Sequence, residues 1–170
     1  MRYNKIRKMD ISNGEGVRVS LFVQGCHFHC KNCFNPETWD FEGGKEFTSR
    51  TLAILLDLCS NPTRKGLSIL GGEPLNDENY QGVLDIAKEF KEYKHTKNKD
   101  IWLWTGYEIE NILWNDEKKE ILQYVDYIVC GPFIEKEKNL KLKWAGSNNQ
   151  RWIDVKETLR NNRPILAGKM

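Results

Sequence analysis

Three cysteines, Cys26, Cys30 and Cys33, lie within eight residues of one another. Their spacing lets one short loop wrap three thiolates around a single metal centre. Thiolates are the usual ligands of iron–sulfur clusters, with four for a typical [4Fe–4S] cube. Three local sulfurs would leave one iron without a protein ligand. An open coordination position of this kind is typical of reactive metal sites rather than structural ones.

A structural zinc site is the alternative for this segment. His27 or His29 would complete a tetrahedral site with the three cysteines. Zinc sites commonly join two short hooks from separate parts of the chain, whereas Cys59, Cys130 and the third histidine, His95, each stand alone. The spacing therefore favours a cluster, with zinc and unligated thiols as the alternatives. If the cluster interpretation holds, the two loop histidines are ordinary polar residues.

The composition excludes several function classes. A chain of 170 residues predicts one domain, and 39% hydrophobic residues with six Trp exclude general disorder. Twenty-six basic against 24 acidic residues give a formal charge of +2, without the basic excess that nucleic-acid binding needs. No apolar run approaches the roughly 20 residues of a membrane span, and the charged amino terminus does not resemble a signal peptide. We therefore expect a cytoplasmic protein, where clustered cysteines indicate metal or redox chemistry.

Strands and helices alternate along the chain and position the cysteine loop. Apolar runs predict strands at 17–23, 67–70, 101–105 and 125–130. Helical spacing predicts helices from Thr48 or Ser49 to Asn61, over 78–93, and over 108–124 with a bend near Asn115 and Asp116. The charged segment 135–143 is expected to be a solvated loop. Beyond Trp144 we expect only short extended pieces, at 151–155 and 164–166.

This order predicts parallel strands joined by right-handed crossovers. A closed eight-unit barrel takes about 250 residues, so the chain is too short for one. We expect an α/β fold in a single domain over 1–170, either an open sheet or a partial barrel of four to six mostly parallel strands. Ligands gather at the carboxyl ends of such strands. The cysteine loop and the turns at 71–74, 104–107 and 130–132 all follow strands, and we expect them to converge on one site.

Two motifs resemble those of the radical S-adenosylmethionine (SAM) enzymes. Cys26-x3-Cys30-x2-Cys33 followed by Phe34 is similar to their cysteine signature, and residues 71–74 (GGEP) are similar to their Gly-Gly-Glu motif. Further blocks resemble the activating proteins of class III, anaerobic ribonucleotide reductases, which are glycyl-radical enzyme activases. These blocks are 10–18 (DISNGEGVR), 22–26 (FVQGC), 33–39 (CFNPETW), 102–107 (WLWTGY) and 144–151 (WAGSNNQR).

The resemblance implies a cofactor site with two sets of residues. The catalytic cluster ligands are Cys26, Cys30 and Cys33, and the SAM contacts are Asn32, Cys33, Phe34, Gly71, Gly72 and Glu73. One [4Fe–4S] cluster would bind the methionine part of SAM at its open iron and cleave it reductively. The resulting 5′-deoxyadenosyl radical would then create a glycyl radical on the anaerobic ribonucleoside-triphosphate reductase.

The resemblance also implies the partners of the protein. These are the glycyl-radical subunit of the reductase and a low-potential electron donor such as a flavodoxin. Family analogy suggests a homodimer, or a heterotetramer with a dimeric reductase. Neither nucleic acid nor a membrane is expected to bind.

Three other functions compete with this interpretation. An activase for a formate-lyase type of glycyl-radical enzyme would tend to be longer, with additional cluster-binding cysteines. A small radical SAM enzyme of modified-nucleoside synthesis would lack the blocks at 10–18 and 144–151. A non-enzymatic zinc adaptor would be colourless and would not cleave SAM.

The sequence leaves two structural roles open for several residues. Cys130 stands where the family often has Asp, and it either packs or lines the site. Ala145 stands where Arg is common. Arg18 is either a surface charge or a support for the cluster loop, and residues 104–107 form either a cofactor-side wall or a tight turn. Cys59, on the apolar side of a predicted helix, is expected in the core.

Overall fold

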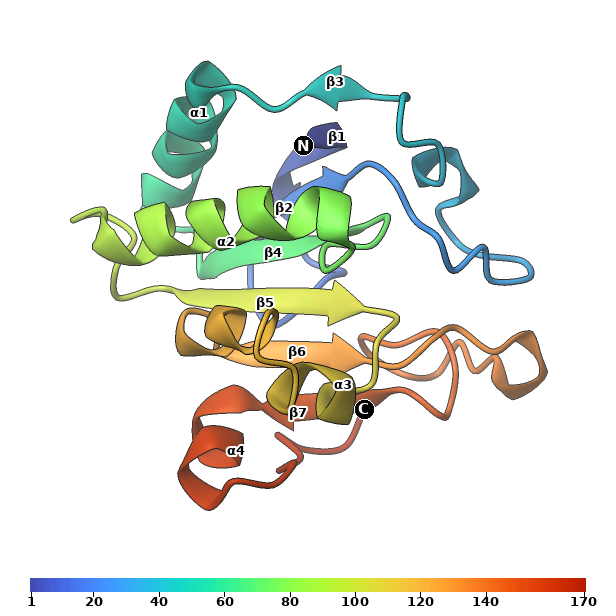
Figure 1. The fold of residues 1–170 in the computed structure, drawn as a ribbon. Helices are drawn as coiled ribbons and strands as arrows, with labels where there is room; N and C mark the ends of the chain where they lie inside the picture. Colours follow the sequence, from blue (N-terminus) through green and yellow to red (C-terminus); the bar gives the residue numbers. More distant parts are fainter.

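Seven strands form one mixed sheet in the computed structural model, which describes residues 1–170 (Figure 1). Their order across the sheet is β3-β1-β2-β4-β5-β6-β7. The strands are β1 (Arg2–Asp10), β2 (Arg18–Val23), β3 (Lys45–Glu46), β4 (Gly66–Gly71), β5 (Asp100–Thr105), β6 (Tyr127–Cys130) and β7 (Arg151–Asp154). The neighbours β2, β4, β5 and β6 pair in parallel, while β1, β3 and β7 join antiparallel.

Four α-helices and three short 3-10 helices connect these strands. The α-helices are α1 (Ser49–Ser60), α2 (Asp77–Glu92), α3 (Ile109–Leu113) and α4 (Val155–Asn161). The 3-10 helices are Pro36–Thr38, Lys119–Gln123 and Glu135–Glu137. None of the helices is both long enough and apolar enough to cross a membrane.

The α/β class and the four predicted parallel strands are confirmed, but the predicted strand count is wrong. The sheet has seven strands rather than four to six, and three of its six pairings are antiparallel. The sequence of β1, RYNKIRKMD, is strongly charged, and most of the strand is only half-buried or exposed. Such a strand lacks the apolar run that marks the buried parallel strands. Strand β7 was expected only as a short extended piece.

The single bent helix predicted over 108–124 is also wrong. The segment forms two short helices, α3 and the 3-10 helix Lys119–Gln123. The side chain of Asn115 accepts hydrogen bonds from the backbone N–H groups of Glu117 (2.8 Å) and Lys118 (3.2 Å). This local turn competes with helix continuation, so the predicted bend becomes a complete break.

Helix α4 was not predicted, although a signal for it exists in the sequence. Asp154 caps its first turn by accepting a hydrogen bond from the backbone N–H of Glu157 at 2.9 Å. Val155 and Thr158 are the buried residues of this seven-residue helix. Two buried positions are too few to produce an apolar periodicity that a sequence pattern can reveal.

Alternation along the strands separates the two faces of the sheet. One set of residues joins the hydrophobic core with α1, α2 and α3; on the strands these residues are Val19, Leu21, Val23, Leu67, Ile69, Ile101, Leu103, Ile128, Cys130 and Ile153. The intervening residues point to the opposite face. They include Phe22, Leu70 and Trp104, which line a cavity. The helices therefore cover one face, and the other face is left for the site.

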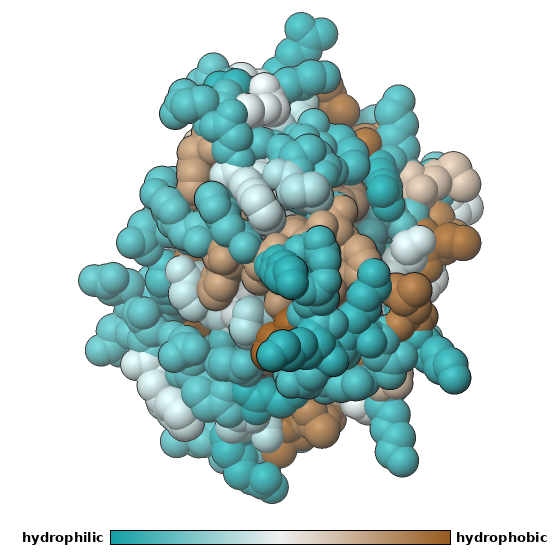
Figure 2. All heavy atoms as spheres, turned by 90° about the vertical axis from the view of Figure 1, so that its right-hand side faces the viewer, coloured by the Kyte–Doolittle hydropathy of each residue, from teal (hydrophilic) through white to brown (hydrophobic).

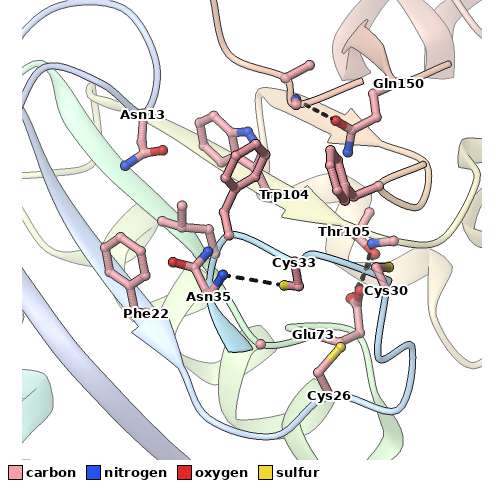
Figure 3. Close-up of a pocket in the computed structure, with 18 of the residues that line it drawn as sticks. Asn13, Phe22, Cys26, Cys30, Cys33, Asn35, Glu73, Trp104, Thr105 and Gln150 are labelled. Carbon is pink, nitrogen blue, oxygen red and sulfur yellow. Dashed lines mark hydrogen bonds between the residues drawn. The ribbon is translucent and has the colours of Figure 1, made fainter. Parts of the chain in front are cut away.

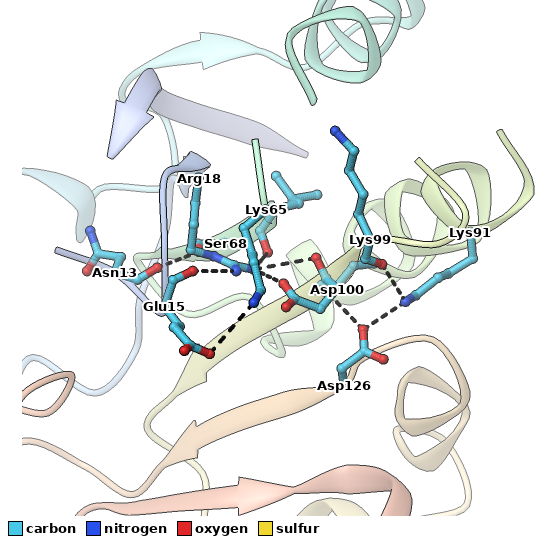
Figure 4. A network of polar contacts seen from close by, with 11 residues as sticks. Asn13, Glu15, Arg18, Lys65, Ser68, Lys91, Lys99, Asp100 and Asp126 are labelled. Atoms are coloured by element: carbon cyan, nitrogen blue, oxygen red, sulfur yellow. Dashed lines mark hydrogen bonds and ion pairs between the residues drawn. The ribbon is translucent and has the colours of Figure 1, made fainter. Parts of the chain in front are cut away.

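Arg18 lies at the amino end of β2, buried with none of its side chain exposed. Its guanidinium pairs with the Asp100 carboxylate at 2.5 Å and donates to the Ser68 hydroxyl at 2.7 Å (Figure 4). The Ser68 hydroxyl donates in turn to the carbonyl of Asn13 at 2.6 Å. These contacts join β2, β4 and β5 to the loop before β2. Arg18 is therefore neither a surface charge nor a support for the cysteine loop, which lies at the other end of β2.

Replacing Arg18 with Ala is expected to lower the free energy of unfolding by about 3–5 kcal/mol, because it leaves a partly buried Asp100 carboxylate without its partner. Urea unfolding of the purified protein measures this difference. Arg50→Ala is the matched control, since Arg50 is exposed at the start of α1. We expect that change to stay within about 0.5 kcal/mol. Equal effects of the two substitutions would contradict this assignment of Arg18.

Candidate cofactor site

A cavity of about 480 Å³ opens at the carboxyl ends of the parallel strands. The predicted turns converge there, because each contributes lining residues. The lining is formed by Arg7, Ser12, Asn13, Phe22, Cys26, Phe28, Cys30, Cys33, Phe34, Asn35, Leu70, Gly71, Gly72, Glu73, Trp104, Thr105, Gly106, Gly131, Phe133, Lys143, Trp144, Ala145, Gly146 and Gln150. Parallel pairing produces this convergence, since it brings the ends of neighbouring strands to one edge of the sheet.

Cys26, Cys30 and Cys33 all line this cavity as free thiols. Cys26 is buried, and the other two are half-buried. Figure 3 shows their side chains grouped around Glu73 at the same side of the cavity. Burial raises the pKa of the Cys26 thiol to about 11 and also raises that of Cys30. A bound cation would reverse this effect by favouring the thiolates.

The two loop histidines make contacts outside the cavity lining. The Nε2 atom of His27 lies 2.9 Å from the Glu78 carboxylate, and its ring packs 4.4 Å from that of Phe41. The ring of His29 stacks on Trp39 at 4.6 Å. Both therefore behave as polar loop residues. No three His, Cys, Asp or Glu side chains in the structure gather closely enough to hold a single metal ion.

Glu73 is a buried carboxylate that joins the ends of two strands. One oxygen accepts from the Leu75 backbone N–H at 2.9 Å and the Thr105 hydroxyl at 2.7 Å. The other accepts from the Gly106 backbone N–H at 2.7 Å. Burial raises the pKa of Glu73 to about 7, although the three hydrogen bonds oppose the rise. Glu73 thus fixes the turn after β4 to the turn after β5.

Gly71 and Gly72 lie against the end of β2. The φ angle of Gly71 is +111°, in the left-handed region that favours glycine. A Cβ atom on Gly72 would lie 2.4 Å from the carbonyl oxygen of Gly25. The backbone N–H groups of Gly72 and Glu73 already donate to Val23 (2.9 Å) and Gly25 (2.8 Å). Packing between neighbouring strand ends therefore requires glycine here, independently of any ligand.

The segment 144–150 forms one wall of the cavity, and Gln150 holds it in place. The Gln150 side-chain oxygen accepts from the backbone N–H groups of Gly146 (2.7 Å) and Ser147 (3.2 Å). Its amide nitrogen donates to the Gly131 carbonyl at 2.9 Å. The Trp104 indole N–H donates to the Trp144 carbonyl at 2.7 Å. The wall is thus tied to the ends of both β5 and β6.

Arg151 directly follows this wall in the chain, and its ion pairs with two glutamates hold it in place. It pairs with Glu110 through both guanidinium nitrogens, at 2.9 and 2.5 Å, and with Glu108 at 2.9 Å. The pairing lowers the pKa of Glu110. Arg151 also lies opposite Cys130 in the register between β6 and β7. The motif at 144–151 is therefore explained by hydrogen bonds that shape the wall.

The predicted SAM contacts are divided between the cavity and the surface. Cys33, Phe34, Gly71, Gly72 and Glu73 line the cavity. Asn32 does not line it; the residue is exposed, with a φ of +55°, and its side chain donates to Glu135. The ring of Phe34 packs 5.0 Å from that of Phe133 across the cavity rim.

The two departures from the family pattern lie in different places. Cys130 is fully buried in the core on the helix-facing side of β6, so it packs and does not line the cavity. Burial raises the pKa of its thiol to about 11. Ala145 lines the cavity. Cys59 is fully buried in the core, as predicted.

The donor set fits an iron–sulfur cluster. Three thiols from one loop share a cavity large enough for a group beyond a single ion, and the other two cysteines lie in the core. Aromatic rings and the backbone of two strand ends supply the rest of the lining. Such a donor set can hold a [4Fe–4S] cluster in which one iron has no protein ligand.

Comparison with known proteins agrees with this geometry. A protein family described as a 4Fe-4S single cluster domain matches residues 12–153. The anaerobic ribonucleoside-triphosphate reductase-activating protein of Vibrio cholerae is 38% identical over 152 residues, which cover 88% of this chain and 96% of that protein. This chain belongs to the family of anaerobic ribonucleoside-triphosphate reductase-activating proteins. The family's representative in Enterobacteria phage T4 is 40% identical, covering 89% of this chain and 92% of the phage protein, and that of Escherichia coli K12 is 35% identical, covering 88% and 96%.

Sequence reasoning missed several residues that line the cavity. Arg7, Ser12 and Asn13 come from β1 and the loop after it, and Phe133 from the connection after β6. The block at 10–18 was noticed as a family resemblance without a structural role. No spacing rule places β1 beside the cavity, because its position depends on antiparallel pairing with β2.

The buried carboxylate of Glu73 predicts a pH-dependent stability. The folded state holds its proton up to about pH 7, whereas the unfolded chain releases it near pH 4.5. The folded state then binds more protons between these values, so the unfolding free energy falls through this group as the pH rises. Glu73→Gln removes this dependence. We therefore expect the wild-type advantage over the variant to be larger at pH 5 than at pH 8.

Urea unfolding of the reduced, cluster-free protein at both pH values measures this effect. The control is Glu92→Gln, at an exposed position at the end of α2. Its difference from the wild type should be the same at the two pH values. A wild-type advantage over Glu73→Gln that does not change with pH would contradict the assignment.

Gln150→Ala is expected to loosen the cavity wall. Loss of the side-chain acceptor should raise the hydrogen-exchange rates of the Gly146 and Ser147 amides by about fivefold, because one hydrogen bond contributes about 1 kcal/mol. Hydrogen exchange followed by mass spectrometry or NMR measures these rates. Gln123→Ala, at an exposed position, serves as the control and should leave both amides unchanged. Unchanged rates in Gln150→Ala would show that the wall is held by other contacts.

Proposed function

We propose that this protein activates an anaerobic ribonucleoside-triphosphate reductase by reductive cleavage of SAM, as a radical SAM activase. The observation that carries the proposal is the shared cavity of Cys26, Cys30 and Cys33 at the carboxyl ends of four parallel strands. The names of the family's relatives, reductase-activating proteins, support the choice of partner. We further propose that the whole chain, 1–170, acts as one domain with an open, partial-barrel sheet.

The residues of the chain would hold both groups. Cys26, Cys30 and Cys33 would bind three irons of the cluster. When bound, the cluster would supply an electron to SAM, and the resulting 5′-deoxyadenosyl radical would supply the means to remove a hydrogen atom from a backbone glycine of the reductase. The N–H groups of Gly72 and Glu73 donate within the fold, and the SAM amino group is itself a donor, so this turn would bind that group through backbone carbonyl oxygens.

The aromatic lining would orient the adenine and exclude water. Phe34 and Phe133 lie together at the rim of the cavity, and Trp104, near the carboxyl end of β5, also lines it. Flat rings of this kind pack favourably against a planar base. Glu73 would act as a positioning residue, since both of its oxygens are occupied by Leu75, Thr105 and Gly106.

The partner is proposed to be a protein rather than a small molecule. The cavity is open at the strand ends, beside exposed apolar residues such as Phe28 and Phe34. An opening of this kind admits a backbone loop of another protein. A low-potential protein such as a flavodoxin would supply the electron.

The first test is iron and sulfide analysis of the anaerobically reconstituted protein. We expect about four irons and four sulfides per chain, a brown chromophore bleached by dithionite, and release of 5′-deoxyadenosine from SAM. Cys30→Ala should lose SAM cleavage by at least about 100-fold, because a direct ligand matters more than its outer-shell partners. Cys130→Ala is the matched control and should retain iron and cleavage.

A different result would identify a different function. One zinc per chain, without a chromophore after reconstitution, would overturn the proposal and leave a structural metal module. SAM cleavage without a glycyl radical signal on the reductase, measured by electron paramagnetic resonance, would instead leave a radical SAM enzyme with another substrate. The same assay with a formate-lyase type of enzyme separates the related activase.

A further inference from the structure

The connection between β6 and β7 carries an ordered projection, residues 133–144, which we call the tongue. It extends past the carboxyl ends of the strands (Figure 1, orange). The backbone N–H of Asn139 donates to Gly146 at 3.0 Å, and that of Asn148 donates to Glu137 at 2.9 Å. The Asn139 side chain also donates to that of Asn148 at 2.8 Å. These bonds hold the tip of the tongue in a defined conformation.

The tongue carries an excess of positive charge. It holds four lysines, Lys136, Lys138, Lys141 and Lys143, and two glutamates, Glu135 and Glu137. This excess of two charges equals the formal net charge of the whole chain, +2. Glu135 is also engaged by Lys31 at 3.1 Å, which leaves the lysines with few acidic neighbours. The tongue alone thus carries as much net positive charge as the whole chain.

The most exposed apolar side chain of the tongue, that of Leu140, stands at the tip among these lysines. Leu140 is 77% exposed, and it lies in a turn in which the backbone N–H groups of Lys141 and Leu142 donate to Asn139. An apolar side chain surrounded by charged ones resembles the centre and rim of a protein interface. The face at the strand ends is mostly hydrophilic, with apolar side chains emerging between polar ones (Figure 2).

The tongue lies at the mouth of the cavity. Phe133 and Lys143, at its two ends, line the cavity, and Lys138 lies 5.5 Å from the ring centre of Phe34. A polypeptide that enters the cavity must therefore pass beside the tongue. Positive charge at this position would attract an acidic surface and orient it for entry.

We propose that the tongue is a docking element for the protein substrate, and that it binds an acidic surface with an apolar depression for Leu140. This inference rests on the proposed function, because it takes the protein that enters the cavity as the partner. The location favours the substrate over the electron donor, since only the substrate must reach the cavity itself.

The experiment compares three proteins with dithionite as the reductant, which removes the need for a protein donor. They are the wild type, Leu140→Ser with Lys136→Gln and Lys141→Gln, and a control with Leu159→Ser, Lys94→Gln and Lys97→Gln. The control positions are exposed and lie outside the tongue and the cavity lining. Two rates are measured for each: release of 5′-deoxyadenosine without the reductase, and formation of the glycyl radical as the concentration of the reductase is varied.

We expect the tongue variant to keep its SAM cleavage rate and to raise the KM for the reductase about tenfold. Raising the salt concentration should increase the KM of the wild type for the reductase more than that of the tongue variant, because salt screens the lysines. An unchanged KM would overturn the proposal, as would an equal loss of SAM cleavage and activation. Failure of the wild type itself to form a glycyl radical would overturn the proposed function, and direct binding of the reductase to the three proteins would still test the tongue.

Discussion

The parallel pairing of β2, β4, β5 and β6 determines where the segments around the cavity lie. Its register sets Val23 opposite Gly71 and Thr105 opposite Cys130, so that neighbouring strands end together. The turns that follow these strands therefore lie at the same edge of the sheet. The cysteine loop and the turns at 71–74 and 104–107 meet because this register holds, and the antiparallel pairing of β7 with β6 brings the wall at 144–150 to the same edge.

Two buried polar contacts secure the opposite ends of this arrangement. At the amino ends, Arg18 joins three strands through Asp100 and Ser68. At the carboxyl ends, the carboxylate of Glu73 joins the turn after β4 to the turn after β5 through Thr105. Directional contacts of this kind tolerate little displacement, whereas apolar packing on the helix-facing side tolerates more. The polar pairs therefore fix how the strand ends are aligned around the cavity.

The division of the sheet into two faces explains how so small a chain holds a large cavity. Helices cover one face, and the hydrophobic core lies between these helices and the sheet. The other face carries Phe22, Leu70 and Trp104 toward the cavity, and the connection between β6 and β7 closes one side of it. That connection has two parts with different properties: a hydrogen-bonded wall without charged residues and a charged tongue. One segment thus combines a surface for a bound group with a surface suited to a protein.

Local features of this protein can be predicted from its sequence. The spacing of Cys26, Cys30 and Cys33, the apolar runs of the parallel strands and the turns that follow them were all readable, because each depends on residues close together in the chain. Three features depend on the tertiary structure: the antiparallel pairing of β1 and β7, the placement of Asn13 and Gln150 in the cavity lining, and the burial of Arg18. A half-exposed strand has no distinctive pattern of its own, and the partner of a buried charge can lie anywhere in the sequence, as Asp100 does for Arg18. Such contacts depend on distance in space, which pairing and packing set and which local sequence does not encode.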